Sequence, residues 1–265
     1  MTVDWNAVEK ALYPIKDYED LSRRLQTAFA YPFVRETFNF TLPRLVDYTQ
    51  RLLGGDSRGR YTEYTAMLTG ILLALQQAGA TNVEDLVARA KTREHLKGFT
   101  EQSGIPAQDT VAVLKYLVYW FIPMEKPLAS LVRDDPDASE AVKALRVAGI
   151  RTNLELLQQG MTAAGRRTLA ASSGLAEAVV LELVNRADFS RMPWSSKATI
   201  SNIVGAGYGS IAQLAGADPE QLYADFIRYG KAIGKNLKLG QEIDNNYRIA
   251  QLVPRLVYES GEDER

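Results

Sequence analysis

Apolar residues recur at spacings of three and four along almost the whole chain, which is the period of amphipathic α-helices. Alternating runs of β-branched residues bounded by turns are nearly absent, so we expect an all-α protein without a sheet. The most apolar run extends from Val111 to Met124 and is interrupted by Lys115. Because it is shorter than the roughly 20 residues that cross a bilayer, it predicts a buried helix, with a membrane or partner surface as the alternative.

The helical pattern is interrupted near the middle of the chain, at residues 133–139. Acidic residues surround Pro136 there, and a proline disfavours helix in the residue before it, so we expect a linker. We therefore predict an N-terminal helical region over residues 1–132 and a second helical domain over residues 140–254. Residues 255–265 are polar and mostly acidic, which predicts a disordered tail.

The opening of the chain, from Asp4 to about Gly55, is rich in proline and aromatic residues. Prolines interrupt helices, and aromatic side chains offer large apolar surfaces. This composition predicts short helices that pack through aromatic contacts.

An internal repeat is the most informative feature of the sequence. Residues 76–105, QQAGATNVEDLVARAKTREHLKGFTEQSGI, resemble residues 146–175, RVAGIRTNLELLQQGMTAAGRRTLAASSGL, with Ala-Gly and Ser-Gly displaced by 70 in both cases. Residues 204–231 form a weaker third copy. The first copy belongs to residues 76–124, before the predicted linker, so the halves could form one array in which each repeat buries its neighbour's apolar face.

Each copy contains a good N-cap residue 12 positions before a glycine, and each such pair predicts a short helix with a left-handed glycine at its end. The pairs are Thr92 and Gly104, Thr162 and Gly174, and Asp218 and Gly230. A second set of glycines should close the preceding helices: Gly79, Gly149 and Gly207.

Between residues 140 and 195, small, aliphatic and polar residues follow one another in a distinctive order. They are Ala148-Gly149-Ile150, Thr152, Leu156-Leu157, Gly160, Thr162, Gly165-Arg166, Leu169-Ala170, Ser173-Gly174-Leu175, Leu183-Val184-Asn185 and Ala187-Asp188. With these residues the segment resembles a bacterial helix-hairpin-helix-like family catalogued as domain-of-unknown-function family 4332. The resemblance implies tandem helix-hairpin-helix-like repeats, to which this chain adds an N-terminal helical region.

The chain departs from the family pattern directly after Asp188. The family continues with a hairpin that contains two glycines, whereas this chain has RMPWSSK at residues 191–197, without either glycine and with Pro193 lacking a backbone N–H. Helix-hairpin-helix motifs hold a phosphate through backbone N–H groups at a helix N-terminus. The departure therefore weakens the DNA binding that the resemblance implies.

Overall charge gives no attraction to polyanions, because 31 basic and 32 acidic residues leave a net charge of -1. Residues 140–258, however, contain 14 basic and 10 acidic side chains. The absence of cysteine excludes disulfides, thiolate zinc sites and thiol nucleophiles, and it suits a reducing cytoplasm. The N-terminus MTVDWNAVEK does not resemble a signal peptide, so we expect a cytoplasmic protein.

Several glycine turns and basic side chains in the C-terminal half are candidate phosphate contacts. They are Arg166, Arg167, Gly174, Arg191, Lys197, Gly230, Lys231, Gly234, Lys235 and Lys238. The three lysines 231, 235 and 238 have the spacing of one helix face, and backbone amides near the two glycines 230 and 234 could face a phosphate. A solvated face after a glycine cap is the alternative for the lysines, and pairing with Glu155 or Glu177 is the alternative for the first two arginines.

Catalytic chemistry finds little support in the sequence. His95 is the single histidine, and without cysteine it lacks the partners for a metal site or a nucleophile-base pair. The glycine-rich segments at residues 205–209 and 230–236 lack the spacing of dinucleotide-binding or phosphate-binding loops. We expect no enzyme, no cofactor and no metal.

These observations favour a non-enzymatic binding protein. The first hypothesis is weak, sequence-independent binding of DNA or RNA by the C-terminal domain. The second is a docking scaffold or oligomerisation module that binds another protein or a second copy of itself through aromatic surfaces, such as the cluster Tyr119-Trp120-Phe121.

Overall fold

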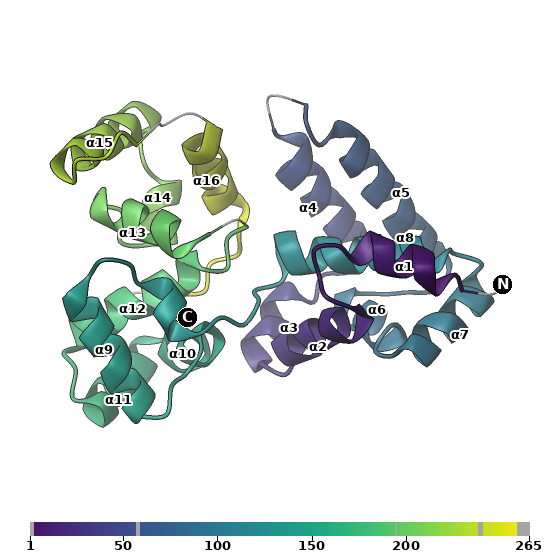
Figure 1. Ribbon diagram of the computed structural model, residues 1–265, viewed down its shortest axis with the longest axis horizontal. Coiled ribbons are helices and arrows are strands. Elements are labelled where there is room, and N and C mark those ends of the chain that lie inside the picture. Colours follow the sequence, from purple (N-terminus) through teal and green to yellow (C-terminus); the bar gives the residue numbers. More distant parts are fainter. Residues whose placement is uncertain (1–2, 57–58, 194, 238–240, 259–265) are drawn as a thin grey trace. The chain divides into compact units, whose positions relative to one another are not determined.

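The computed structural model describes residues 3–56, 59–193, 195–237 and 241–258, and for residues 241–246 it describes only the backbone (Figure 1). The chain forms two compact units, Met1–Met124 and Glu125–Arg265. Each is described here by itself, as unit 1 and unit 2.

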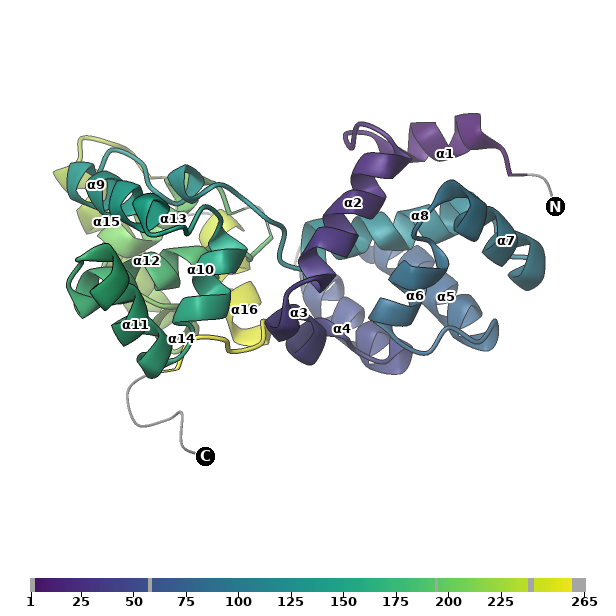
Figure 2. The ribbon, with the colours of Figure 1, turned by 90° about the horizontal axis from the view of Figure 1, so that it is seen from below.

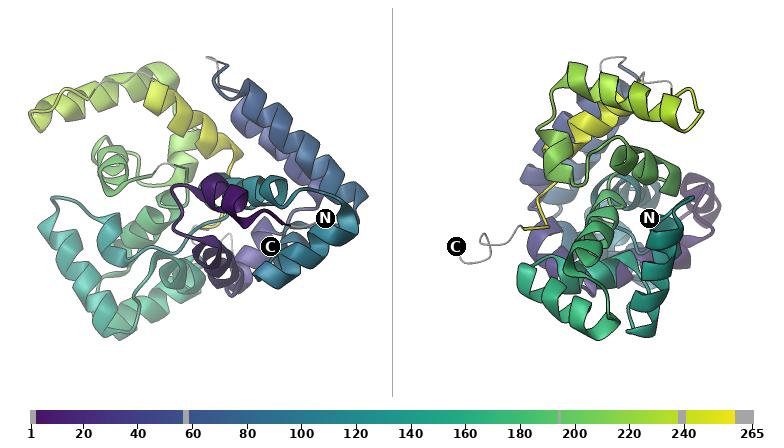
Figure 3. Two further views of the ribbon diagram at one scale, coloured as in Figure 1. Left: turned by 45° about the vertical axis from the view of Figure 1, so that its right-hand side comes forward. Right: turned by 90° about the vertical axis from the view of Figure 1, so that its left-hand side faces the viewer.

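The described residues of unit 1 form eight α-helices followed by one π-helical turn. They are α1 (Trp5–Leu12), α2 (Tyr18–Phe29), α3 (Pro32–Phe38), α4 (Leu42–Gly54), α5 (Thr62–Gln77), α6 (Val83–Arg89), α7 (Arg93–Ser103), α8 (Ala107–Tyr116) and η1 (Leu117–Phe121). The longest pair, α4 and α5, forms an antiparallel hairpin (Figure 3, left), and α5 also contacts α8.

Unit 2 begins with a short 3-10 helix and continues with α-helices. They are η2 (Leu128–Leu131), α9 (Pro136–Val147), α10 (Asn153–Gly160), α11 (Ala163–Ser173), α12 (Glu177–Phe189), α13 (Lys197–Gly205), α14 (Ile211–Ala215), α15 (Pro219–Ala232) and α16 (Gln241–Leu252). Helices α10, α11 and α12 pack against one another (Figure 2), and α16 packs against α14.

The described residues contain no strand beyond two isolated backbone bridges, which confirms the all-α prediction. No single helix in this part of the chain is long and apolar enough to span a bilayer. The adjacent helices α11 and α12 reach the required length and composition only together, with a bend of 115° between them.

Aromatic side chains form the centre of unit 1, as the composition of its opening predicts. Phe121 makes ring contacts with Phe38, Phe40 and Tyr48 at centroid distances of 5.7, 4.8 and 5.2 Å. All four side chains are buried. The apolar run that begins at Val111 is therefore a core element, α-helical to Tyr116 and π-helical beyond it.

Three helices end in the same glycine turn. Gly79, Gly149 and Gly207 have φ angles of 86°, 94° and 104°, and each donates its N–H to the carbonyl three residues earlier. The residue after each glycine donates to the carbonyl five residues earlier, which completes a Schellman motif. The prediction that these glycines close the helices α5, α9 and α13 is confirmed.

A capped helix follows each of these turns at a constant spacing. Asn82, Thr152 and Ser210 lie three residues after the glycine and cap α6, α10 and α14 through their side-chain oxygens. The predicted caps of the next helices are also present, at Thr92, Thr162 and Asp218. The order of helices and caps thus recurs three times, while helix-hairpin-helix geometry remains a prediction from the sequence.

The predicted left-handed ends are correct for α7 and α11 but wrong for α15. Gly104 and Gly174 have φ angles of 73° and 71°. Gly230, in contrast, lies inside α15, which continues to Ala232, and the left-handed residue is Gly234. A Cβ atom on Gly230 would lie 2.8 Å from the Lys235 carbonyl oxygen, so this glycine permits close packing instead of ending the helix.

The two units are divided before the predicted linker, between Met124 and Glu125. Pro136 occupies the first turn of α9, where a missing N–H costs no hydrogen bond, and the Asp135 side chain accepts from the Ala138 N–H at 3.0 Å. The acidic proline segment at residues 133–139 is therefore largely the start of a helix in unit 2.

Gly79 and Gly98 provide a matched pair for testing the turn. Neither would place a Cβ within 4 Å of another atom, but Gly79 is left-handed whereas Gly98 lies inside α7. We expect Gly79→Ala to destabilise unit 1 by about 1–2 kcal/mol and Gly98→Ala to stabilise it by about 0.5–1 kcal/mol, measured by denaturant unfolding. Stabilisation by both substitutions would contradict the assigned turn.

Candidate functional site

Arg166, a predicted phosphate contact, lies inside unit 2 and is 2% exposed. Its guanidinium donates to the carbonyl oxygens of Gly160 and Met161, both at 3.2 Å, and to that of Tyr258 at 2.8 Å. The prediction for this residue is wrong, because its donors are engaged with backbone acceptors and no phosphate can reach them.

Arg191 is also buried and is likewise not a surface contact. Its Nε donates to a carboxylate oxygen of Asp188 at 2.5 Å, and its Nη2 donates to the carbonyl oxygen of Pro254. Burial raises the pKa of the Asp188 carboxyl group, while the neighbouring guanidinium opposes that rise. The two opposite charges neutralise each other, and the bond from Arg191 to Pro254 fixes the backbone that follows α16.

Residues 254–258 form a segment, here called the C-terminal strap, that these two arginines hold. The Tyr258 N–H donates to the Met161 carbonyl oxygen at 3.1 Å, and Leu256 is 3% exposed. The prediction of a disordered tail is therefore wrong for residues 255–258, because apolar burial and these hydrogen bonds fix them. The remainder of that prediction, residues 259–265, lies outside the described residues.

The segment between α12 and α13, where the family pattern has its second hairpin, is mostly buried. Met192, Pro193 and Ser195 are buried, and Ser196 caps α13 by accepting from the Thr199 N–H at 3.1 Å. Lys197, at the first position of that helix, is exposed. The start of α13 is therefore the part of this segment that faces solvent.

Lys126 lies at the C-terminal end of α12. Its ammonium group donates to the carbonyl oxygens of Ser190 at 2.5 Å and Ser195 at 3.3 Å. Burial lowers the pKa of this lysine, but the carbonyl end of a helix favours a cation. Lys126 therefore acts as a structural cap of the helix end.

The glycine-lysine segment after α15 is a helix C-terminus, which has the wrong polarity for a phosphate site. The N–H groups of Gly234 and Lys235 donate to the carbonyl oxygens of Lys231 and Gly230, at 3.2 and 2.8 Å. No amide of this turn is left for an anion, and the helix dipole is negative here. Since α15 ends at Ala232, Lys235 does not share a helix face with Lys231.

Lysines at this end of α15 complement the dipole instead. Lys231 and Lys235 are exposed, and the third lysine of the predicted set, Lys238, lies outside the described residues.

Two predicted contacts remain at the surface, Arg167 within α11 and Gly174 at the turn between α11 and α12. Arg167 and Gly174 are exposed, and the Gly174 N–H donates to the Ala170 carbonyl oxygen at 3.0 Å. Glu177 occupies the first turn of α12. Its carboxylate already complements the positive end of that helix, so the turn is poorly suited to an anion.

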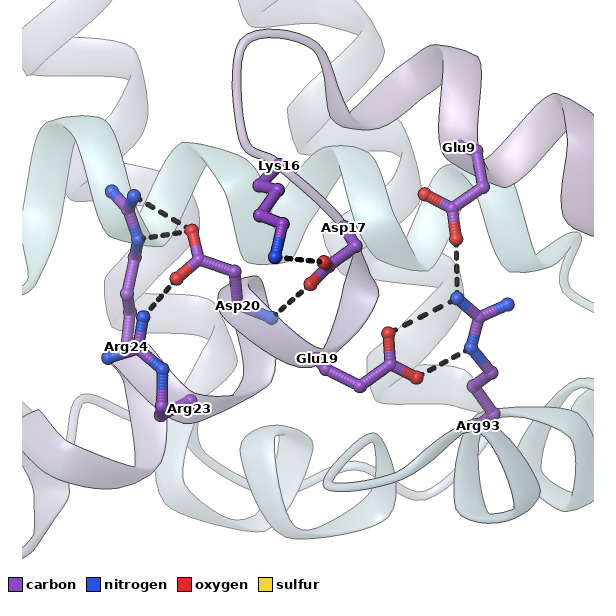
Figure 4. Close-up of polar contacts among 8 residues, drawn as sticks. All are labelled: Glu9, Lys16, Asp17, Glu19, Asp20, Arg23, Arg24 and Arg93. Atoms are coloured by element: carbon purple, nitrogen blue, oxygen red, sulfur yellow. Dashed lines mark hydrogen bonds and ion pairs between the residues drawn. The ribbon is translucent and has the colours of Figure 1, made fainter.

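In unit 1, an open groove of about 390 Å³ lies between α2 and the start of α7. Arg93 lies beside it and joins three helices (Figure 4), because its guanidinium pairs with Glu9 at 2.6 Å and with Glu19 at 2.7 Å and covers the ring of Trp5 at 4.5 Å. The hydrogen bond from Arg93, chiefly, lowers the pKa of Glu19. On the other side of α2, Asp20 pairs with Arg23 and Arg24.

The ion pairs of Arg93 hold α1, α2 and α7 together. The described residues contain no group of three or more His, Asp or Glu side chains that could hold a metal ion. His95 is exposed, and its Nδ1 lies 2.8 Å from the Thr92 hydroxyl oxygen, the N-cap of α7.

The structure contradicts the prediction that the aromatic residues Trp120 and Phe121 form a docking surface, because both side chains are buried. Trp120 and Phe121 are 8% and 5% exposed, and most aromatic side chains of the first 55 residues belong to the core. Large apolar side chains are exposed elsewhere, among them Tyr13 and Val147, and α5 carries two of them, Met67 at 44% and Leu73 at 47%.

We call the solvent-facing side of α5 the α5 outer face. It comprises Glu63, Ala66, Met67, Gly70, Leu73, Ala74 and Gln77, of which all except the half-buried Ala74 are exposed. None of the described residues of unit 1 covers it. The sequence contained a signal for this surface, since residues 64–77 form a run without any charge on a 16-residue helix.

The family model described as Domain of unknown function (DUF4332) matches residues 138–247. The match supports the resemblance noted for residues 140–195, extends it through most of unit 2, and leaves unit 1 outside. No curated protein and no solved structure matches the chain.

Substitutions of Arg166, which is buried, and of its neighbour Arg167, which is exposed, test the contact with the C-terminal strap. We expect Arg166→Met to destabilise unit 2 by about 2–4 kcal/mol, because three carbonyl oxygens lose a donor that lies inside the unit, and Arg167→Met to change its stability by less than about 0.5 kcal/mol. Denaturant unfolding gives the stability, and hydrogen exchange of residues 254–258 should accelerate only in the first variant. Equal effects would contradict the burial of Arg166.

The contact between Arg93 and Glu19 predicts a pH dependence. The folded pKa of Glu19 lies below its ordinary value of 4.5, so the stability from this contact is present above that value and is lost as pH falls through the folded pKa. Thermal unfolding between about pH 5 and pH 3 should therefore show a steeper loss in the native chain than in Arg93→Met. Lys91→Met, which removes a nearby exposed charge, should retain the native slope.

Proposed function

We propose that this protein is a non-enzymatic scaffold that binds another protein chain, and that the α5 outer face contacts an uncharged helix of that partner. The observation that carries the proposal is the exposure of Met67 and Leu73 on a helix without charge between residues 64 and 77. Helices that face only solvent normally present charged and polar side chains there. An exposed apolar helix face is typical of a protein contact.

The use of the other conspicuous side chains supports the same proposal. Arg93, Arg166 and Arg191 are engaged in joining segments within their own unit. The aromatic cluster around Phe121 is buried in the core of unit 1. Of the large side chains that the sequence suggested for binding, few remain free, whereas the α5 outer face has no partner within unit 1.

A capture experiment tests this proposal. Leu73→Glu places a charge at the centre of the face, whereas Gln76→Glu places the same charge on an exposed position of α5 outside it. We expect a partner captured from source-cell lysate by the native chain and by Gln76→Glu, lost with Leu73→Glu, and bound again when both components are purified. Identical capture by all three chains would contradict the proposed contact surface.

Weak binding of nucleic acid is a second candidate, supported by one specific observation. Arg167, Lys197, Lys231 and Lys235 are exposed, and none of them forms an ion pair with another described residue. Such free cations can neutralise phosphates without any base recognition. The backbone amides that a helix-hairpin-helix motif would supply do not support this function here.

A salt series distinguishes the second candidate. If these four side chains neutralise phosphates, the logarithm of the binding constant should fall with the logarithm of salt concentration by about 0.9 for each contact on duplex DNA. Changing Arg167, Lys197, Lys231 and Lys235 together to Glu should abolish binding, whereas Arg23→Glu in unit 1 should leave it unchanged. No binding to duplex or single strands at low salt would exclude this function.

A further inference from the structure

The residues of the α5 outer face are arranged symmetrically about Gly70. Large apolar side chains lie three residues to either side, at Met67 and Leu73, and alanines lie four residues to either side, at positions 66 and 74. A helix turns by about 100° per residue, so these positions and the polar pair Glu63 and Gln77, seven residues away, all lie within about 60° of Gly70. The face therefore has nearly the same composition when read in either direction.

A surface of this kind is complementary to a second copy of itself in an antiparallel arrangement. A two-fold axis through Gly70 places Met67 against Leu73 of the other copy, so that each large side chain packs against another. The same axis places Glu63 near Gln77 of the other copy, where the amide can donate to the carboxylate. A parallel arrangement would instead bring the two Glu63 carboxylates together, which is unfavourable.

Gly70 also provides the space that such a contact needs. It is exposed, and a Cβ atom added to it would meet nothing within 4 Å, so nothing in unit 1 requires a glycine at this position. A glycine inside a helix costs roughly 0.5–1 kcal/mol relative to alanine. Together with the alanines at 66 and 74, it lets a second helix approach closely.

We propose that two copies of the chain associate through their α5 outer faces, with antiparallel helices that cross at Gly70. This inference rests on the proposed protein-binding function and names the partner as a second copy of the same chain. One helix pair buries less than the ~800 Å² per partner of a stable complex, so the association is weak, with a dissociation constant of about 10 µM to 1 mM.

Single cysteines test the crossing point directly, because the native chain contains no cysteine. A disulfide needs Cα atoms within about 7 Å of each other. On the two-fold axis, Gly70→Cys should therefore form a disulfide-linked dimer rapidly. Met67→Cys alone should not form this dimer, because the two cysteines would be about 9 Å apart along the helix axes. A chain that carries both Met67→Cys and Leu73→Cys should form it, because residue 67 of one copy faces residue 73 of the other.

The control is Gln76→Cys, an exposed position of the same helix outside the face. Cross-linking of Gly70→Cys no faster than that of Gln76→Cys would overturn the proposal. Efficient cross-linking of Met67→Cys alone would overturn the antiparallel arrangement.

Gly70→Leu distinguishes a specific helix crossing at this residue from non-specific hydrophobic association. The open space at this position accommodates the side chain without disturbing unit 1, but the leucine would separate the two helices. Sedimentation equilibrium should show at least tenfold weaker association than in the native chain, and stronger association would overturn the proposal. A native chain that is monomeric at millimolar concentration also overturns it, while the protein-binding function would survive if the capture experiment succeeds.

Discussion

Short helices leave many backbone groups without a partner, and the way this chain satisfies them governs its structure. The α-helices contain between 5 and 16 residues, and each leaves up to four N–H and four carbonyl groups outside its own hydrogen-bond ladder. Side-chain oxygens such as that of Thr152 satisfy the first turns, and left-handed glycines such as Gly149 satisfy the last. The path of the chain between helices follows from these local solutions, which recur in the same order in both units.

That locality explains how much the sequence could predict. Caps and left-handed glycines depend on residues only a few positions apart, so Thr92, Thr162 and Gly174 could be assigned from the sequence. Gly230 was assigned wrongly, because α15 continues past it to Ala232 and the left-handed residue is Gly234. The burial of Arg166 was also beyond a local argument, since its acceptor Tyr258 is 92 residues away. Likewise the candidate site failed where remote segments covered the predicted cations.

Two buried arginines and two exposed apolar side chains depart from the usual distribution of residue types in a folded protein. Arg166 and Arg191 lie inside unit 2 and fix the C-terminal strap through carbonyl oxygens, whereas Met67 and Leu73 face solvent on unit 1. Buried guanidinium groups with satisfied donors confer a defined geometry on a segment that is not helical. The candidate binding surfaces are therefore largely apolar on α5 and basic, without ion-pair partners among the described residues, on unit 2.

The strap has a consequence for the order in which the protein matures. A ribosome delivers the chain from its N-terminus, and domains generally fold as units in that order. Residues up to 124 form a compact unit by themselves, so this unit can fold while translation continues. Unit 2 completes its hydrogen bonds later, because two acceptors of its buried arginines, the carbonyl oxygens of Pro254 and Tyr258, lie in the strap. The two arginines therefore reach their full set of hydrogen bonds only after the strap has been synthesised.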